Sequence, residues 1–241
     1  MRPTPGFRAR AQLPLSLIES ELMLHPATEL GAVSPDIGVG IFASGFIPKG
    51  TIIYIKDPLE IVIEEGDNRL QDPAMRKLID RYSYMEPTGK RIVSWDLAKY
   101  MNHSCDANSI STGYGFEIAI RDIEPGEEIT DDYGLLNVEQ RMPCCCGASN
   151  CRGWIGEDDI QKYHTKWDSL ARDALAYYYY VSQPLGGLMD TLTRRQLQRY
   201  LDTGEGFRSV NQLRLHARKP ARAVSLSADT PPLIEAVGDF G

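Results

Sequence analysis

Residues 100–109 read YMNHSCDANS, and residues 143–151 read PCCCGASNC. The five cysteines of the chain all lie in these two stretches. Three of them, Cys144, Cys146 and Cys151, have the spacing C-x-C-x4-C. Thiolates held this close in a tight turn repel one another unless a cation neutralises them, and zinc takes four ligands in a closed structural site. The pattern therefore predicts a zinc site that needs a fourth ligand.

Two cysteines remain for that position. Cys145 lies between two ligands and is poorly placed, whereas Cys105 comes from the distant first stretch, so we predict Cys105. The alternative is a cluster of buried free thiols, but a turn of sequence CCCGASNC offers little apolar surface to bury them. One zinc held by Cys105 and the 144–151 turn would clamp two distant segments together and couple metal affinity to folding.

The whole-chain composition is that of a globular protein. The 241 residues suffice for one good-sized domain with an appendage or for two small domains. A net charge of -7 argues against nucleic-acid binding, including that of a zinc ribbon, and favours a basic partner. No apolar run is long enough to cross a membrane, and the first residues, MRPTPGFRAR, precede no apolar segment of a secretory signal. We expect an intracellular protein, cytoplasmic or nuclear, whose reduced cysteines bind metal rather than form disulfides.

Residues 30–133 carry mostly strand signals, in short apolar runs separated by glycine and proline turns. The predicted strands include residues 52–54, 61–63 and 127–130, and a strand in which Phe116, Ile118 and Ile120 alternate with Glu117, Ala119 and Arg121. Asp72-Pro73 can open one or two helical turns over residues 72–83. The sequence thus predicts an irregular, mainly β domain.

From Asp158 onward the pattern becomes helical. Apolar residues recur every three or four positions at Ile160, Tyr163, Trp167, Leu170, Ala174 and Tyr178. A shorter helix is predicted at residues 192–201, with Gly204 beyond its end. We expect the apolar stripe to pack against the β domain; the alternative is a docking or dimer surface.

Four motifs occur in order along the chain. They are GVGIFA at 38–43; Asn102-His103-Ser104-Cys105 with Asn108; GEEIT at 126–130 leading to Asp132-Tyr133-Gly134; and the cysteine turn followed by Arg152-Gly153. Together they resemble the G-x-G, NHSC-x-x-N, GEELT-x-DYG and C-x-C-G…C-R-G motifs of SET-domain protein-lysine methyltransferases with a post-SET zinc motif. The resemblance covers roughly residues 28–156.

The resemblance implies a fold and a reaction. The fold would be small β-sheets around a pseudoknot, with a C-terminal α-helical extension added in this chain. The reaction would transfer a methyl group from S-adenosylmethionine to a lysine ε-amine of a protein substrate, which could be a basic tail. Tyr133 would be catalytic, beside the transferred methyl. The resemblance places the cofactor against Gly38, Val39, Gly40, Asn102, His103, Tyr133 and Trp154, and zinc on Cys105, Cys144, Cys146 and Cys151.

The chain then divides into five parts. They are an N-terminal tail (1–27), the SET domain (28–134), the post-SET zinc motif (135–156), a helical extension (157–203) and a flexible tail (204–241).

Two positions depart from the family pattern. The residue two before the catalytic tyrosine is usually aromatic and influences how many methyl groups are added, but here it is Asp131. The family usually has a tyrosine at a position that aligns near Lys56, and this chain has none there. Tyr54 lies on the same strand face and can substitute for it. These changes motivate an alternative function, a catalytically inactive SET-fold module that binds proteins.

Overall fold

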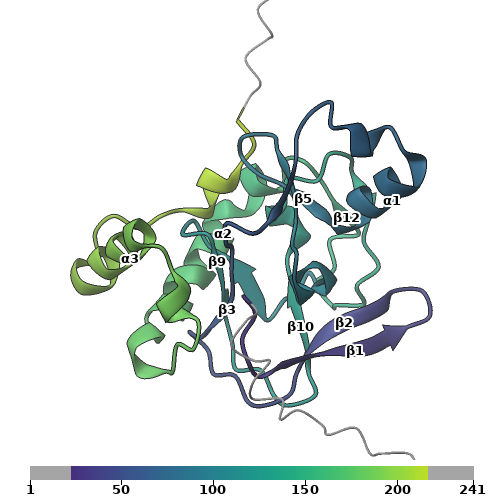
Figure 1. Ribbon diagram of the computed structural model, residues 1–241. Coiled ribbons are helices and arrows are strands. Elements are labelled where there is room, and N and C mark those ends of the chain that lie inside the picture. The colour runs from purple at the N-terminus through teal and green to yellow at the C-terminus, as the bar shows by residue number, and fades with distance from the viewer. Residues whose placement is uncertain (1–22, 217–241) are drawn as a thin grey trace, which may run out of the picture.

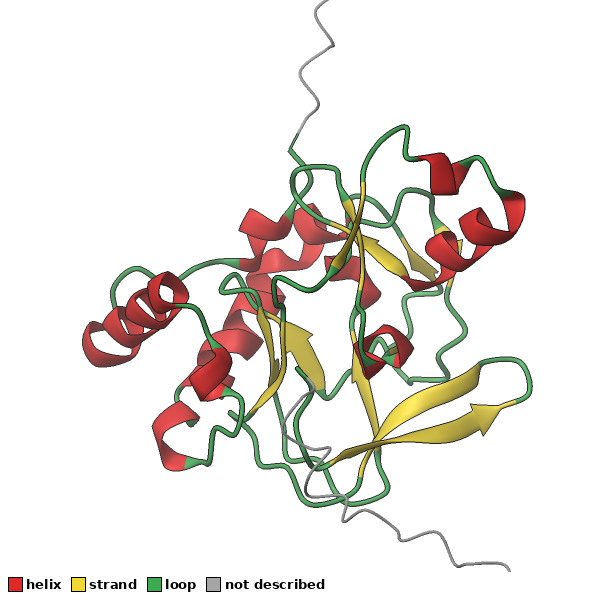
Figure 2. Cartoon of the chain, in the orientation of Figure 1, coloured by secondary structure: helices red, strands yellow, loops and turns green. Residues whose placement is uncertain are grey.

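The computed structural model describes residues 23–216. Short strands form small separate sheets around a shared interior, and the longer helices α2 and α3 lie on one side of them (Figures 1 and 2). The four-stranded sheet has the order β1-β2-β10-β7. Its strands are β1 (Thr28–Ser34), β2 (Gly38–Ala43), β10 (Glu128–Asp131) and β7 (Asn102–His103).

The other sheets are smaller still. One has the order β3-β9-β8, with β3 (Ile52–Ile55), β9 (Phe116–Ala119) and β8 (Ser109–Ser111). A second has the order β4-β6-β5, with β4 (Ile61–Ile63), β6 (Arg91–Val93) and β5 (Ser83–Met85). The last pairs β11 (Met142–Pro143) with β12 (Trp154–Ile155). The predicted mainly β architecture is confirmed.

One pairing matters most for the site. β10 runs parallel to β7, with Thr130 opposite Asn102 and Asp131 opposite His103. Parallel neighbours need a crossover between them, and here the chain from 104 to 127 makes it. β10 also pairs antiparallel with β2, so it lies between the 38–43 and 102–103 segments. Three segments distant in sequence therefore become adjacent strands.

An aspartate directly precedes each α-helix. The first two are α1 (Pro73–Tyr82) and α2 (Asp159–Leu175), and the third is α3 (Thr191–Thr203). Asp72 caps α1 and Asp190 caps α3 by accepting backbone N–H groups of the first turn, as is typical of N-cap residues. Gly204 ends α3 with a φ of 74°, a conformation that glycine adopts without strain. Short 3-10 turns lie at Asn68–Leu70, Leu97–Tyr100, Tyr133–Leu135, Tyr178–Tyr180, Gly186–Leu188 and Val210–Leu213.

The apolar stripe of α2 packs against the β domain, as expected. Trp167 and Ala174 are buried in one cluster with Ile52 of β3 and Ile118 of β9. Burying a large apolar side chain contributes roughly 1.5–3 kcal/mol. The helix therefore belongs to the core of the molecule.

Packed structure continues into both segments that the sequence analysis assigns to tails. Leu24, assigned to the N-terminal tail, is buried and bridges to Tyr54. Val210, assigned to the C-terminal tail, is fully buried, and its N–H donates to Asp168 Oδ1 at 2.8 Å. Burial of these apolar residues and their hydrogen bonds together offset part of the entropy lost on ordering each segment, although the sequence there has no sustained period. The rest of both tails, 1–22 and 217–241, lies outside the described residues.

Within residues 23–216, no helix is long and apolar enough to span a membrane.

Candidate active site and metal centre

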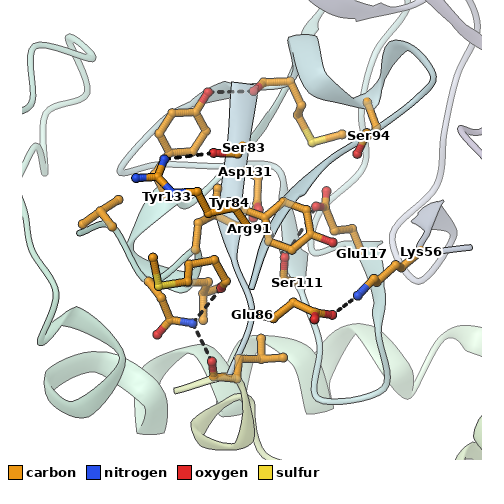
Figure 3. Close-up of a pocket in the computed structure, with 18 of the residues that line it drawn as sticks. Lys56, Ser83, Tyr84, Glu86, Arg91, Ser94, Ser111, Glu117, Asp131 and Tyr133 are labelled. Atoms are coloured by element: carbon orange, nitrogen blue, oxygen red, sulfur yellow. Dashed lines mark hydrogen bonds and ion pairs between the residues drawn. The ribbon is translucent and has the colours of Figure 1, made fainter. Parts of the chain in front are cut away.

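A cavity of about 910 Å³ opens between the small sheets (Figure 3). Its volume is in the range typical of small-molecule and substrate sites. Five tyrosines line it, among them Tyr54, Tyr84 and Tyr133, and its acidic residues include Glu117 and Asp131. Tyr54 comes from β3, and its hydroxyl contacts Glu60 and Ser94. The cavity thus combines aromatic walls with buried carboxyl groups.

Tyr133 is the residue best fixed in this cavity. It lies two residues beyond the end of β10, and its hydroxyl donates to the Met101 carbonyl at 2.8 Å. Its backbone N–H donates to His103 Nδ1 at 3.1 Å, and the two rings are 5.3 Å apart. Burial, reinforced by the charges of Asp131 and Glu117, raises the pKa of Tyr133 above its ordinary value. The phenol therefore stays neutral at physiological pH.

The hydrogen bonds of His103 assign its tautomer. Since Nδ1 accepts the N–H of Tyr133, the proton of the neutral ring lies on Nε2. Nε2 then donates to Cys105 Sγ at 3.3 Å. Burial lowers the pKa of His103, which favours this neutral form. In this tautomer His103 supports Cys105 through a hydrogen bond.

The segments predicted to contact a cofactor meet on the four-stranded sheet. Asn102 Nδ2 donates to the Val39 carbonyl at 3.1 Å and to Glu128 Oε1 at 2.8 Å. A Cβ at Gly40 would overlap both the Asn102 amide and the Glu128 carboxylate, so a larger residue there would force these side chains to shift. Gly38 differs, because a Cβ there would meet only Arg81 Nη2, at 3.7 Å.

Trp154 does not join the others. It is 47% exposed on β12, its ring lies under the Arg141 guanidinium at 4.7 Å, and it lines a separate hollow of about 310 Å³. Of the seven residues predicted to bind a cofactor, Tyr133 lines the large cavity, five lie on β2 and β7 at either side of β10, and Trp154 lies apart.

The cysteines from the two opening stretches do meet. Cys105 Sγ lies 3.8 Å from Cys144 Sγ, which lies 3.7 Å from Cys151 Sγ. Cys146 Sγ accepts the backbone N–H of Cys105 at 3.4 Å. Ligand atoms of His103, Cys105, Cys144 and Cys146 all lie within 4.8 Å of one another. Cys145 is exposed.

Backbone N–H groups surround the four sulfur atoms. The N–H of Arg152 donates to Cys105 and that of Gly153 donates to Cys151, both at 3.4 Å. Burial acts against ionisation of Cys146, but backbone donors, including the N–H of Cys105, bring its pKa down to about 7. Burial acts the other way on two neighbours and raises the pKa of Cys105 and of Cys144. A metal ion binds the thiolate form, so a bound cation would offset this cost. The cluster of His103 and the cysteines is therefore a group that could hold zinc, with Cys151 outside the set whose ligand atoms are all within 4.8 Å of one another.

Residues 38–134 match the family model described as "SET domain". The chain contains a SET domain. This finding confirms the resemblance drawn from the three motifs that lie between residues 38 and 134, and the cysteine cluster beyond them is consistent with a post-SET motif. Histone-lysine N-methyltransferase Set2 of Drosophila melanogaster is 34% identical over 134 residues, which are 49% of this chain and 6% of that protein. The H3 lysine-36 specific histone-lysine N-methyltransferase of Debaryomyces hansenii is 31% identical over 188 residues, which are 73% of this chain and 23% of that protein.

The chain thus spans less than a quarter of either curated relative. Among solved structures, the methyltransferase domain of human histone-lysine N-methyltransferase SETMAR is 22% identical and covers 56% of this chain and 58% of its own. Its TM-score of 0.36 is too low to support a detailed comparison.

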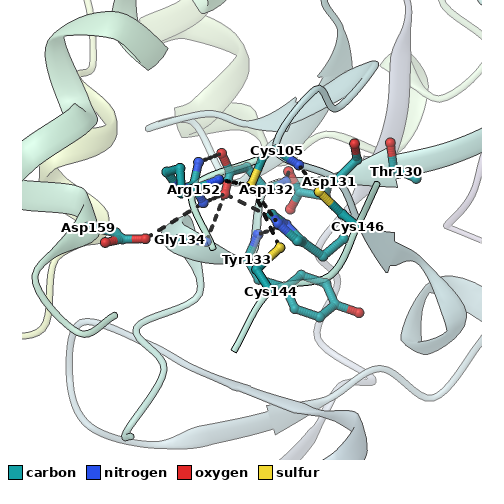
Figure 4. A network of polar contacts seen from close by, with 12 residues as sticks. Cys105, Thr130, Asp131, Asp132, Tyr133, Gly134, Cys144, Cys146, Arg152 and Asp159 are labelled. Carbon is teal, nitrogen blue, oxygen red and sulfur yellow. Dashed lines mark hydrogen bonds and ion pairs between the residues drawn. The ribbon is translucent and has the colours of Figure 1, made fainter. Parts of the chain in front are cut away.

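A charged network joins the SET domain to the cysteine turn and to α2 (Figure 4). Arg152 donates to both carboxylate oxygens of Asp132, each at 2.6 Å, and Trp167 Nε1 donates to the same carboxylate at 3.1 Å. Two parallel bonds of this kind are among the strongest polar contacts in proteins. Both Asp132 and Arg152 belong to the motifs, but the sequence analysis gives neither a role. The signal that could have revealed one is that Asp132 directly precedes Tyr133 and Arg152 directly follows Cys151.

The cavity of the SET domain also contains two residues that sequence reasoning missed, Glu117 and Ser111. They are opposite each other on β9 and β8, and Asp131 of β10, already noted as a departure from the family, completes the group. Ser111 Oγ donates to Asp131 Oδ2 at 3.2 Å and approaches Glu117 Oε1 at 3.5 Å. Glu117 alternates with Phe116 and Ile118, a pattern that normally turns the acid toward solvent. Here that face lines the cavity.

Proposed function

We propose that this protein is an S-adenosylmethionine-dependent methyltransferase that transfers a methyl group to a lysine ε-amine of a protein substrate. The observation that carries the proposal is the position of Tyr133, which follows the strand between the 38–43 and 102–103 segments and lines the large cavity. Relatives named histone-lysine N-methyltransferases support the reaction class.

The cofactor would lie against the β2–β10–β7 strands. Support comes from Gly38, where φ is +93° and the space beside the backbone is open apart from Arg81. Arg81 also lines the large cavity, so the cavity wall reaches the G-x-G turn. Bound there, S-adenosylmethionine would supply a methyl group already activated by its sulfonium. The protein then mainly has to align the donor and acceptor atoms.

Tyr133 would orient the reacting groups. Its hydroxyl proton is committed to the Met101 carbonyl, which leaves the oxygen lone pairs free to face an electron-poor methyl group. The raised pKa keeps the hydroxyl intact over the pH range in which lysine methylation would run. Aromatic walls beside the acceptor amine would favour its neutral form, whereas the carboxyl groups of the same cavity would favour its ammonium form.

Zinc would hold the wall of this site rather than take part in transfer. Cys105, Cys144, Cys146 and Cys151 would provide its four ligands, with no position open for substrate. Tyr133 packs against this cysteine cluster. The metal would therefore stabilise the segment that carries the catalytic residue.

A basic protein segment is the substrate class we propose. The chain carries a net charge of -7, and the relatives are named for histones. Opposite charge raises the encounter rate of such a pair.

Two measurements on the purified chain test the function. Calorimetry should detect S-adenosylmethionine binding, and incubation with methyl-labelled cofactor should label lysines in purified core histones or in a cell extract. Labelled residues are identified by mass spectrometry. If neither cofactor binding nor labelling occurs, the proposal is wrong.

The second candidate is a binding module that has lost transfer. Asp131 favours it, because the carboxyl occupies a position beside Tyr133 where an aromatic residue is usual in the family. This candidate predicts binding of a basic peptide without labelling of any protein. Labelling of a lysine in any substrate excludes it.

A further inference from the structure

The acidic group in the large cavity has no counter-charge from the protein. Asp131 is only 2% exposed, and the Oε2 atom of Glu117 is buried without a hydrogen-bond partner. Both side chains line the cavity (Figure 3). Among residues 23–216, no lysine, arginine or histidine forms an ion pair with either of them.

Other acids of the same cavity are paired. Glu86 forms an ion pair with Lys56, and Arg91 pairs with Glu139 and with Asp80 at 2.8 Å. These pairs are near the opening, where solvent reduces the cost of charge. Buried carboxyl groups are normally paired because an uncompensated charge is costly in a region without water. The two unpaired acids are therefore the unusual feature of the cavity.

The surroundings of the pair point to an organic cation. Tyr84 and Tyr133 line the cavity beside the two acids, and the charge of Glu117 acts on the phenol of each. Aromatic faces and carboxylates together attract an ammonium group on an alkyl chain. Ser111, between the two acids, holds Asp131 in place.

We propose that Glu117 and Asp131 form the binding site for the acceptor lysine as its ammonium ion and take up the proton that the nitrogen must lose. This inference rests on the proposed function. One proton moves from the nitrogen to a carboxylate oxygen of the pair, which leaves a neutral amine with a free electron pair. That electron pair forms the new N–C bond as the S–C bond breaks, and the positive charge passes from sulfur to nitrogen.

The acid–base properties of the pair suit this role. Burial raises the pKa of Glu117 well above its ordinary value and that of Asp131 to about 7. Proton transfer is most efficient when the pKa of the acceptor approaches that of the donor. The groups near the pair include Ser111, Tyr84, Tyr133 and Asp132, and Arg81 acts on Tyr133 in the opposite sense by lowering its pKa.

The test uses n-butylammonium, which has the chain and charge of a lysine side chain, and n-butanol as its neutral counterpart. Binding to the full chain is followed by NMR titration at pH 8. The variants are Glu117→Gln and Asp131→Asn, with Glu86→Gln as the control at the cavity opening. Butylammonium should bind the unaltered chain and the control at least about tenfold more tightly than butanol, and each test variant should lose that preference.

Calorimetry with S-adenosylmethionine distinguishes the two possible cations. The donor affinity should stay within about twofold in both test variants, because the pair is assigned to the acceptor. A variant that loses the donor but keeps butylammonium would place the sulfonium, not the ammonium, at the pair and overturn the inference. Equal binding of butylammonium and butanol would mean that the carboxyls only share a proton, and would overturn it too. Labelling of a lysine substrate, measured separately, decides the proposed function whichever result is found.

Discussion

A single phenol is held by contacts from three directions. The Tyr133 hydroxyl donates to Met101, its N–H donates to His103, and its ring packs against the cysteine cluster. Such over-determination fixes the side chain before any ligand arrives, which is how a protein pre-organises a reacting position.

Tyr133→Phe should therefore separate chemistry from folding. The change removes one hydroxyl and keeps the ring, so we expect turnover to fall by about a hundredfold or more. The lost hydrogen bond is worth about 1 kcal/mol, so the unfolding midpoint should shift by no more than about 4 °C. Labelling kinetics and thermal denaturation measure the two effects.

Tyr179→Phe is the matched control. Its hydroxyl is at the surface and bonds Asp202 at 3.0 Å. This variant should keep turnover and stability, whereas a Tyr133→Phe protein with full turnover would remove Tyr133 from its role.

The pH dependence of stability should report on Asp131. Burial raises its pKa from 3.8 to about 7, so the folded state binds a proton that the unfolded state has already lost between these values. Stability contributed by the protonated form is therefore lost as pH rises from about 4 to about 7. Asp131→Asn removes this loss and should raise the unfolding midpoint by roughly 5 °C or more at pH 8.

At pH 5 the gain should be clearly smaller, because the native carboxyl is then largely protonated. Thermal denaturation of both proteins at the two pH values makes the comparison. A gain that is the same at pH 5 and pH 8 would show that Asp131 does not titrate with a raised pKa.

The elements could be predicted better from the sequence than the site could. Local signals are sufficient for helix ends, since Asp72 and Asp190 cap α1 and α3, and Gly204 ends α3. Period-2 patterns locate the strands, but they cannot tell which face of a small sheet borders a cavity. The position of Glu117 depends on β8, β9 and β10 coming together, which is a non-local property.

The cysteine turn is an element whose position should depend on metal. We expect one zinc per chain, lost in Cys151→Ser and retained in Cys145→Ser, because only the first removes a ligand. His103→Asn should also retain it, since the His103 ring donates a hydrogen bond to Cys105. Elemental analysis of each purified variant counts the zinc.

Removing the metal with a chelator should lower the unfolding midpoint by about 10 °C or more, because binding and folding are coupled. Loss of zinc from the His103 variant together with retention in the Cys151 variant would reverse the assignment of the fourth ligand.

The ion pair of Arg152 with Asp132, which links the cysteine turn to α2, should contribute strongly to the free energy of unfolding. Arg152→Met leaves the Asp132 carboxylate buried without its cation, and we expect a loss of about 3–5 kcal/mol in the free energy of unfolding. Denaturant titration measures it. The control is Arg199→Met, because Arg199 pairs with Glu205 at the surface, where an ion pair contributes about 0–1 kcal/mol. Equal losses in the two variants would contradict a buried clamp.

At the scale of the whole molecule, the C-terminal segment closes the fold. Asn137 connects it to the region after the SET motif, since Nδ2 donates to the Leu213 carbonyl at 2.7 Å and Oδ1 accepts the N–H of Leu215 at 2.9 Å. Residues Arg208, Gln212 and Leu213 also line the large cavity. The segment therefore contributes to both stability and the site.

Two shortened chains test this contribution, one ending at His216 and one ending at Thr203. Both lack residues 217–241, so the difference between them reports on 204–216 alone. The shorter chain loses the burial of Val210 and the hydrogen bonds of Asp168 and Asn137 to this segment, which together contribute roughly 3 kcal/mol or more. Its unfolding midpoint should be lower by about 6–12 °C. Because part of the cavity wall is removed as well, the shorter chain should also bind butylammonium more weakly. Equal unfolding midpoints for the two chains would mean that residues 204–216 do not stabilise the fold.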